Sequence, residues 1–427
     1  MVRPSVRLDY PVHERYLDNG IRVVVSPDHA TPSVAVNLWY DVGSRHEVAG
    51  RTGFAHLFEH LMFQGSAHVE PAQHIAILEA AGARANATTS FDRTNYYESG
   101  PAGLLDLVLW MEADRLGTLL TALDQANLDN QRDVVKEEKR QRYDNVPYGD
   151  TLEHLLALTF PEGHPYSHPT IGSMEDLDAA SLDDVRAFFE AFYMPNNAVL
   201  SVVGAVTPDE VWARAEHFFS PIAARTRQPH TPAPSLPPLS GTPRIELQQP
   251  VPADAVYLTW RLPPLDSRAY DALRLALDVL GDGQTSRLYR GLVREAGLAE
   301  SAASGTIGLI DGTSLGFVMA RARADTTAET LEQALRTHLE DFAADGPTAD
   351  ELARARAQHE RSTLQDLASL GTRADLLSGY SVLCDEPELV NRRLGQVMGL
   401  ADADIILATN HVLGPEQSAT LIYHSTL

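Results

Sequence analysis

The stretch SLDDVRAFFEAFYMPNNAVLSVVG, residues 181–204, decides the fold because its pattern occurs twice in the chain. It predicts a helix, a Pro-Asn turn and a buried strand in that order. Residues 401–424, ADADIILATNHVLGPEQSATLIYH, predict the same order, and Pro415 follows Pro195 by 220 residues. This period is too long for a solenoid, so the repeat predicts two similar domains.

The beginnings of the two halves match as well. Residues 33–44, SVAVNLWYDVGS, predict a strand that leads through a glycine-containing turn into a helix over 53–63. Residues 255–264, AVYLTWRLPP, likewise predict a strand followed by a helix over 269–281. Strand-turn-strand segments such as 83–100 lie between the helices. This irregular mixture favours an α+β fold built from two homologous α/β domains over a doubly wound parallel sheet.

A proline-rich segment separates the halves. Residues 221–252 hold nine of the 26 prolines of the chain. Proline resists both helix and central strand, so the composition predicts a linker. The expected domains are therefore an N-terminal unit, residues 1–220, and a C-terminal unit, residues 253–427.

Composition narrows the classes of partner and cofactor. The chain has 34 Lys and Arg against 58 Asp and Glu, a formal net charge of −24, which argues against a nucleic-acid backbone or an anionic membrane as main partner. Cys384 is the single cysteine, so a disulfide or cysteine-based metal site within one chain is excluded. No apolar run has the length of a signal peptide or a membrane span, which predicts a cytoplasmic protein. Any metal must be held by histidines and carboxylates.

One short motif carries chemistry. In the predicted helix, His56 and His60 lie four residues apart and share a face, and Glu59 points to the same side. A hydrolytic zinc site needs about three protein ligands, an open position for water and a carboxylate that takes a proton from that water. The alternative is an ordinary amphipathic helix, because the pattern alone suggests a metal site without establishing one.

The segment HLFEHLMFQG, residues 56–65, resembles the inverted zinc motif of the pitrilysin family of metallopeptidases, the inverzincins. The similarity is to its short bacterial members related to mitochondrial processing peptidase. The resemblance implies one zinc ion per chain, held by His56, His60 and a Glu about 76 intervening residues further on, with Glu59 as the base. Counting from His60 gives Glu137. The competing residue is Glu138, and spacing alone favours Glu137.

Many relatives carry a second Glu seven residues before the third ligand, where it supports the site from outside. Counting back from Glu137, this position is Asn130. An amide can form hydrogen bonds there but supplies no charge.

The resemblance also implies where substrate binds. The segment GARANATTSFDRTNYYES, residues 82–99, resembles the edge strand against which an extended peptide pairs through its backbone. Asn86, Ala87 and Thr88 occupy its substrate-facing stretch. The C-terminal domain, which lacks the motif, resembles the catalytically silent half, and the two domains together are expected to form one half of a clam-shaped peptidase chamber.

A partner subunit is a further expectation. In relatives that work alone, the silent half supplies an Arg and a Tyr seven residues apart near the metal, but the loop 305–317 contains neither residue type. Arg373 and Tyr380 have this spacing but lie on a predicted helix, and we take their spacing as coincidence. We therefore expect a homodimer, or a heterodimer with a similar subunit that lacks the zinc motif.

The predicted function is that of a zinc-dependent endopeptidase. It would act on short or unfolded peptides, such as leader or targeting peptides, inside a closed chamber. One alternative is a non-catalytic core or assembly subunit that keeps the fold. Another is a metal-binding protein without hydrolysis.

Overall fold

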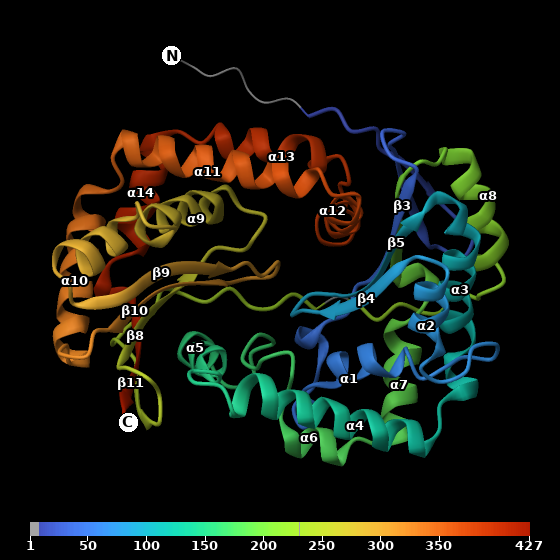
Figure 1. The fold of residues 1–427 in the computed structure, drawn as a ribbon, viewed down its shortest axis with the longest axis horizontal. Coiled ribbons are helices and arrows are strands. Elements are labelled where there is room, and N and C mark those ends of the chain that lie inside the picture. Colours follow the sequence, from blue (N-terminus) through green and yellow to red (C-terminus); the bar gives the residue numbers. More distant parts are fainter. Residues whose placement is uncertain (1–7, 230) are drawn as a thin grey trace.

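Two β-sheets with matching strand orders organise the chain (Figure 1). The computed structural model describes residues 8–229 and 231–427, so the first seven residues of the predicted N-terminal domain and residue 230 of the predicted linker lie outside the described residues. The first sheet contains β1 (His13–Tyr16), β2 (Arg22–Pro27), β3 (Ser33–Tyr40), β4 (Arg84–Thr89), β5 (Thr94–Pro101) and β6 (Ala198–Gly204). The second sheet contains β7 (Arg244–Gln249), β8 (Ala255–Leu262), β9 (Ala299–Ile307), β10 (Ser314–Ala322) and β11 (Ala419–Ser425).

The topology confirms the predicted duplication. The sheet orders are β1-β2-β6-β3-β5-β4 and β7-β11-β8-β10-β9, so five strands correspond one to one and β1 is additional. The pair β2 and β6 is parallel, as is the corresponding pair β7 and β11. The remaining neighbours in both sheets are antiparallel. The fold is thus two copies of one α+β unit.

The helices also divide between the two halves. Those of the N-terminal half are α1 (Phe54–Leu61), α2 (Gln73–Ala80), α3 (Leu105–Ala122), α4 (Gln125–Lys139), α5 (Thr151–Thr159), α6 (Met174–Ala179), α7 (Leu182–Phe192) and α8 (Pro208–Phe219). Those of the C-terminal half are α9 (Arg268–Gly281), α10 (Ala328–Asp345), α11 (Ala349–Leu367), α12 (Leu370–Leu383), α13 (Leu389–Met398) and α14 (Asp402–Val412). Short 3-10 or π-helical turns are η1 (Ser44–His46), η2 (Ala102–Leu104), η3 (Arg140–Asp144), η4 (Pro195–Asn197), η5 (Tyr289–Glu295) and η6 (Pro415–Gln417).

The repeated sequence pattern forms the predicted elements. Helix α7, turn η4 and strand β6 follow one another as expected, and α14, η6 and β11 repeat them. The predicted strand and helix at the start of each half are β3 with α1 and β8 with α9. Within the described part of the chain, no helix has the length and apolarity that a membrane span requires.

The predicted linker, residues 221–252, is wrong at its C-terminal end. Helix α8 ends at Phe219, but regular structure resumes at Arg244, where β7 pairs with β11. The prolines at 243 and 250 flank this strand without interrupting it. Strand β7 lies at the sheet edge, where such flanking prolines are tolerated.

The two halves exchange helices. Helix α12 of the C-terminal half packs on β3 and β6, whereas α5 of the N-terminal half packs on β8 and β11 (Figure 1). Each sheet is therefore covered on one face by its own half and on the other by a helix of the opposite half. This explains why β3 and β6 are buried almost throughout, in place of the alternating exposure of a one-sided sheet.

A carboxylate on α12 anchors it to the first sheet. Asp375 Oδ1 accepts hydrogen bonds from Trp39 Nε1 (2.8 Å), Asn95 Nδ2 (2.8 Å) and Asn37 Nδ2 (3.2 Å). Asn37 and Asn95 are both buried. Because their amide groups have no access to bulk water, the contact to Asp375 compensates for their burial.

Replacing Asp375 by Ala should lower the free energy of unfolding by about 3 kcal/mol, because buried donors lose a charged acceptor. Urea unfolding followed by circular dichroism measures this change. The matched control is Asp341→Ala on the exposed side of α10, which should change stability by less than about 0.5 kcal/mol. Equal stability of the two variants would contradict the anchoring role.

Candidate functional site

Helix α1 begins at a position fixed by one glycine and one buried carboxylate. Gly53 has φ 88°, in the left-handed region that favours glycine, and an added Cβ would lie 2.8 Å from the Ile171 carbonyl oxygen. The carboxylate of Glu47 accepts hydrogen bonds from the backbone N–H of Gly53 (2.8 Å) and of Ala55 (2.7 Å). It therefore satisfies amide groups that have no partner within the helix.

The motif residues lie on the half-buried face of α1. The opposite face is in the hydrophobic core and consists of Phe54, Ala55, Leu57, Phe58 and Leu61. Since these apolar residues fix the rotation of the helix, His56, Glu59 and His60 are turned towards α4 and β4.

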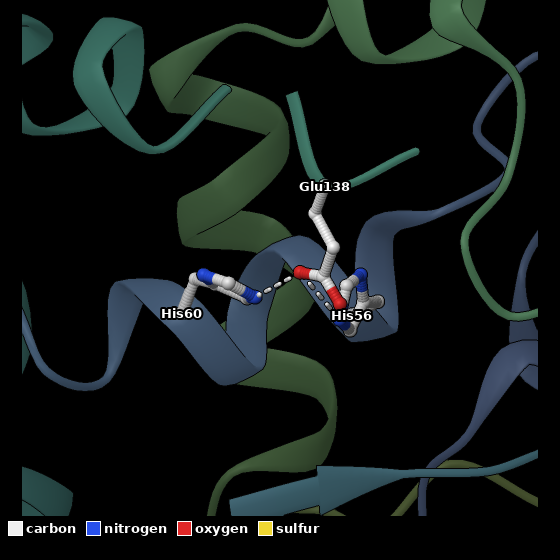
Figure 2. Close-up of side chains that lie close together, drawn as sticks. All are labelled: His56, His60 and Glu138. Carbon is white, nitrogen blue, oxygen red and sulfur yellow. Dashed lines mark ion pairs between the residues drawn. The ribbon is translucent and has the colours of Figure 1, made fainter. Parts of the chain in front are cut away.

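Glu138 of α4 meets both histidines (Figure 2). Its Oε2 atom lies 3.3 Å from His60 Nε2 and 3.7 Å from His56 Nε2. One ligand atom from each residue lies within 4.8 Å of the other two. The side chains are 13% (His56), 21% (His60) and 17% (Glu138) exposed, so water reaches them.

The predictions for Glu137 and Asn130 are wrong, because both residues lie on the outer face of α4. The Glu137 side chain is 53% exposed and bonds to Arg140 (3.1 Å) and Gln141 (2.8 Å). Asn130 is exposed. The residue seven positions before Glu138 is Gln131, which is buried.

The helical periodicity of α4 points to Glu138. Leu128, Gln131 and Val135 are buried on α4, and Glu138 continues this row at the next helical step. Glu137 lies two residues after Val135, roughly opposite in the helix. The spacing from His60 alone selected Glu137, one residue before the residue that contacts the histidines.

The surroundings set the charge states of the donor atoms. Burial, followed by the charge of His60, lowers the pKa of His56 to about 4, so this imidazole is neutral at pH 7. The hydrogen bond from His60 lowers the pKa of the Glu138 carboxyl, which stays ionised. A neutral imidazole and a carboxylate are the forms that bind metals.

The donor set fits zinc. Two imidazole nitrogens and one carboxylate oxygen converge from two helices, which is the three-ligand set of hydrolytic zinc sites. Hard cations such as Ca²⁺ and Mg²⁺ prefer oxygen ligands, so the two imidazoles argue against them. We conclude that His56, His60 and Glu138 are able to hold zinc.

Glu59 lies beside this set and contacts Thr89. The Thr89 hydroxyl donates a 2.5 Å hydrogen bond to Glu59 Oε2. Burial raises the pKa of Glu59, and the Thr89 hydrogen bond opposes that shift. Thr89 is the last residue of β4, and no pattern in the sequence marks it as a functional residue.

Strand β4 forms the open edge of the first sheet, as predicted, and lies next to α1. Ser90 N–H donates to the Arg93 carbonyl, so the backbone of Asn86 and Thr88 faces β5 and that of Ala87 faces the open edge. The Ala87 N–H bonds to the side-chain oxygen of Asn86 at 2.9 Å. Of the three predicted substrate residues, Ala87 alone offers its backbone to a pairing strand.

A second group of potential metal ligands is already in contact with the guanidinium of Arg115. His74, Glu98 and Glu112 are buried together within the N-terminal half. The Arg115 guanidinium bonds to Glu112 (Arg115 Nε to Oε2, 3.0 Å) and lies 3.9 Å from Glu98. Because a buried guanidinium already contacts both carboxyl groups, we interpret the group as a buried ion-pair network.

One cavity lies away from these residues. It measures about 730 Å³ and is bordered by α7, the start of α1 and the linker, including Phe54, Phe188 and Pro232. His56, Glu59, His60 and Glu138 do not line it.

Comparison with known proteins places the chain in a family. Residues 22–173 match the family model described as insulinase, peptidase family M16, and residues 179–359 match the M16 inactive domain. The zinc protease PqqE of Helicobacter pylori is 30% identical over 419 residues, which cover 96% of this chain and 92% of that protein. The chain belongs to the M16 peptidase family. This is the insulinase or pitrilysin family, so the resemblance seen in the sequence is confirmed.

Solved structures agree with this assignment. A protease from Helicobacter pylori superposes with a TM-score of 0.89 at 27% identity, covering 97% of this chain and 99% of that one. The periplasmic protease PqqL from Escherichia coli has the same fold, with a TM-score of 0.76 at 19% identity. The match covers 98% of this chain but 48% of that chain, so this M16 chain corresponds to one half of the longer protein.

The inactive-domain match does not include the candidate site. His56, Glu59, His60 and Glu138 all lie within residues 22–173. Within the described residues, both groups of potential metal ligands belong to the N-terminal half. The candidate metal ligands therefore lie in the half that matches the model described as insulinase, peptidase family M16.

Glu138→Gln should weaken zinc binding by more than about 100-fold, since loss of a ligand exceeds the effect of losing an outer contact. Glu137→Gln, its neighbour on the outer face of α4, should bind zinc like the unmodified protein. Competition with a fluorescent zinc chelator measures both affinities. The opposite ranking would restore Glu137 as the ligand.

Proposed function

We propose that this M16 protein is a zinc-dependent endopeptidase that hydrolyses short or unfolded peptides, with leader or targeting peptides as candidate substrates. The convergence of His56, His60 and Glu138 beside Glu59 and the open edge of β4 carries the proposal. The names of related zinc proteases support it.

His56, His60 and Glu138 would hold the ion. Zinc, when bound, lowers the pKa of water and polarises carbonyl groups. The partial exposure of the three side chains leaves an approach for water and for a peptide carbonyl.

Glu59 is the proposed general base. It follows His56 by three residues on the same helix face, and its carboxylate is held by Thr89. Glu59 takes a proton from the attacking water and then delivers it to the nitrogen of the leaving amine. Burial raises the pKa of Glu59, which makes its carboxylate a stronger proton acceptor than an exposed one.

Strand β4 is the proposed substrate-binding edge. An extended peptide would add to the first sheet beside β4, with the outward backbone of Ala87 as a pairing position. Asn86 would release the Ala87 N–H when the peptide arrives, while Thr88 keeps the strand attached to β5. Backbone pairing accommodates many sequences, as an endopeptidase for unfolded peptides requires.

A second subunit is part of the proposal. Because the chain corresponds to one half of a longer relative, a closed chamber requires another half, supplied by a second copy or by a similar subunit without the zinc motif. The dimeric state and the cytoplasmic location stay predictions. The competing role of a non-catalytic assembly subunit does not explain why Glu59, His56, His60 and Glu138 stand together.

Glu59→Gln should retain zinc and lower kcat for a quenched fluorescent peptide by about 10²- to 10⁴-fold, the usual contribution of a general base. Glu137→Gln serves as the control and should keep both zinc and activity. Zinc content and peptide hydrolysis are measured on the same preparations. Full activity of the zinc-loaded Glu59 variant would remove this residue from the mechanism.

Thr89→Val should lower kcat by about ten- to hundred-fold with little change in KM, because Glu59 loses a hydrogen bond to a charged group. Thr89→Ser keeps the hydroxyl and should restore most of the rate. Steady-state kinetics of both variants test the contact. A purely structural role would predict equal losses for Val and Ser or a change confined to KM.

A further inference from the structure

A cavity in the C-terminal half occupies the counterpart of the candidate metal site. Helix α9 packs on α11 as α1 packs on α4, and β9 runs beside α9 as β4 runs beside α1 (Figure 1). A cavity of about 270 Å³ lies among α9, α11, α12 and α13. The duplicated fold therefore has two comparable positions, one with the zinc motif and one without it.

A cationic side chain enters this cavity from α9. Arg274 Nη1 and Nη2 lie 3.3 and 3.4 Å from the two ring nitrogens of His359 on α11. A neutral imidazole has one acceptor nitrogen, so at most one of these contacts is a hydrogen bond. The nearest carboxylate of the described residues is that of Asp278, 3.6 Å away and beyond hydrogen-bond distance.

The Arg274 guanidinium has a long ion pair with Asp278, whose carboxylate oxygen lies 3.6 Å from Nη1, beyond the distance of a hydrogen bond. Arg393 also lines the cavity, but Asp271 accepts its hydrogen bond at 2.6 Å. His359 carries no charge at neutral pH because burial and these two cations lower its pKa to about 4. The Arg274 side chain is only 22% exposed, and a cation withdrawn from water in this way favours an anionic partner.

The apolar residues that line the cavity favour an anion with an aliphatic side chain over a small inorganic anion. Leu376, Val390, Leu394 and Val397 give the cavity an apolar wall. This wall disfavours a small inorganic anion and fits an aliphatic side chain. The exposed Asp366 also lines the cavity and offers a partner to a free ammonium group.

We propose that this cavity binds an α-carboxylate that bears an aliphatic side chain, with Arg274 as the carboxylate ligand. The free amino acid and the C-terminal residue of a peptide share this chemistry. The site is independent of the candidate metal centre, since none of its residues belongs to that centre.

Isothermal titration calorimetry of the full chain tests the proposal with L-leucine, N-acetyl-L-leucine and N-acetyl-L-leucinamide. At least one of the two acids should bind, and the amide, which lacks the carboxylate, should bind at least about tenfold more weakly. Binding of L-leucine alone identifies a free amino acid as the ligand, and binding of N-acetyl-L-leucine identifies a peptide C-terminus.

Variants locate the binding position. Arg274→Gln should weaken binding of the acid at least about tenfold, whereas Arg268→Gln, at an exposed position on the same helix, should bind like the unmodified chain. Arg274→Lys keeps the charge without the bidentate geometry and should bind with intermediate affinity. Thermal unfolding shows whether each variant is folded. Equal binding of acid and amide, unchanged binding by a folded Arg274→Gln protein, or no binding at millimolar concentration would overturn the proposal.

Discussion

The contact of Glu138 with His56 and His60 is the interaction on which the interpretation of the N-terminal half depends. It joins α1 to α4 through polar atoms, although Glu138 follows His60 by 78 residues in the sequence. Because the core fixes one face of α1 and Glu47 with Gly53 fixes its start, the imidazoles have a single direction to face. The Glu138 carboxylate lies in that direction. Glu59 and Thr89 then place a base and the edge strand β4 beside the same point.

Each half of the chain needs the other half to bury one face of its sheet. Helices α5 and α12 each cover the sheet of the opposite half, so an isolated half would expose an apolar sheet face. The hydrogen bonds to Asp375 add a polar attachment at one of these contacts. The proline-rich segment is therefore a connection between interlocked units. Strand β4 and α1 keep their relative position because the sheet behind them is packed on both faces.

Periodicity predicted the elements of this fold well. The repeated pattern at 181–204 and 401–424 predicted α7, β6, α14 and β11, and the alternation at 33–44 predicted β3. Periodicity did not predict which elements contact each other in the folded chain. Residue spacing selected Glu137, although the burial of Leu128 and Val135 turns Glu138 inward. The exchange of α5 and α12 left no mark in the sequence, since an apolar helix face does not specify the sheet that it covers. Arg373 and Tyr380 lie on a helix, as the sequence predicted. The sheet against which this helix packs could not be predicted from its apolar residues.

The duplication explains how one fold presents two different sites. In the N-terminal half, histidines on the first helix face a carboxylate on α4; in the C-terminal half, Arg274 on α9 faces His359 on α11. Zinc-edge anomalous diffraction from crystals of the zinc-loaded protein tests the central claim most directly. We predict one anomalous peak about 2.0–2.2 Å from His56 Nε2, His60 Nε2 and a Glu138 carboxylate oxygen. A peak bonded to Glu137, or the absence of a peak between α1 and α4, would contradict the account.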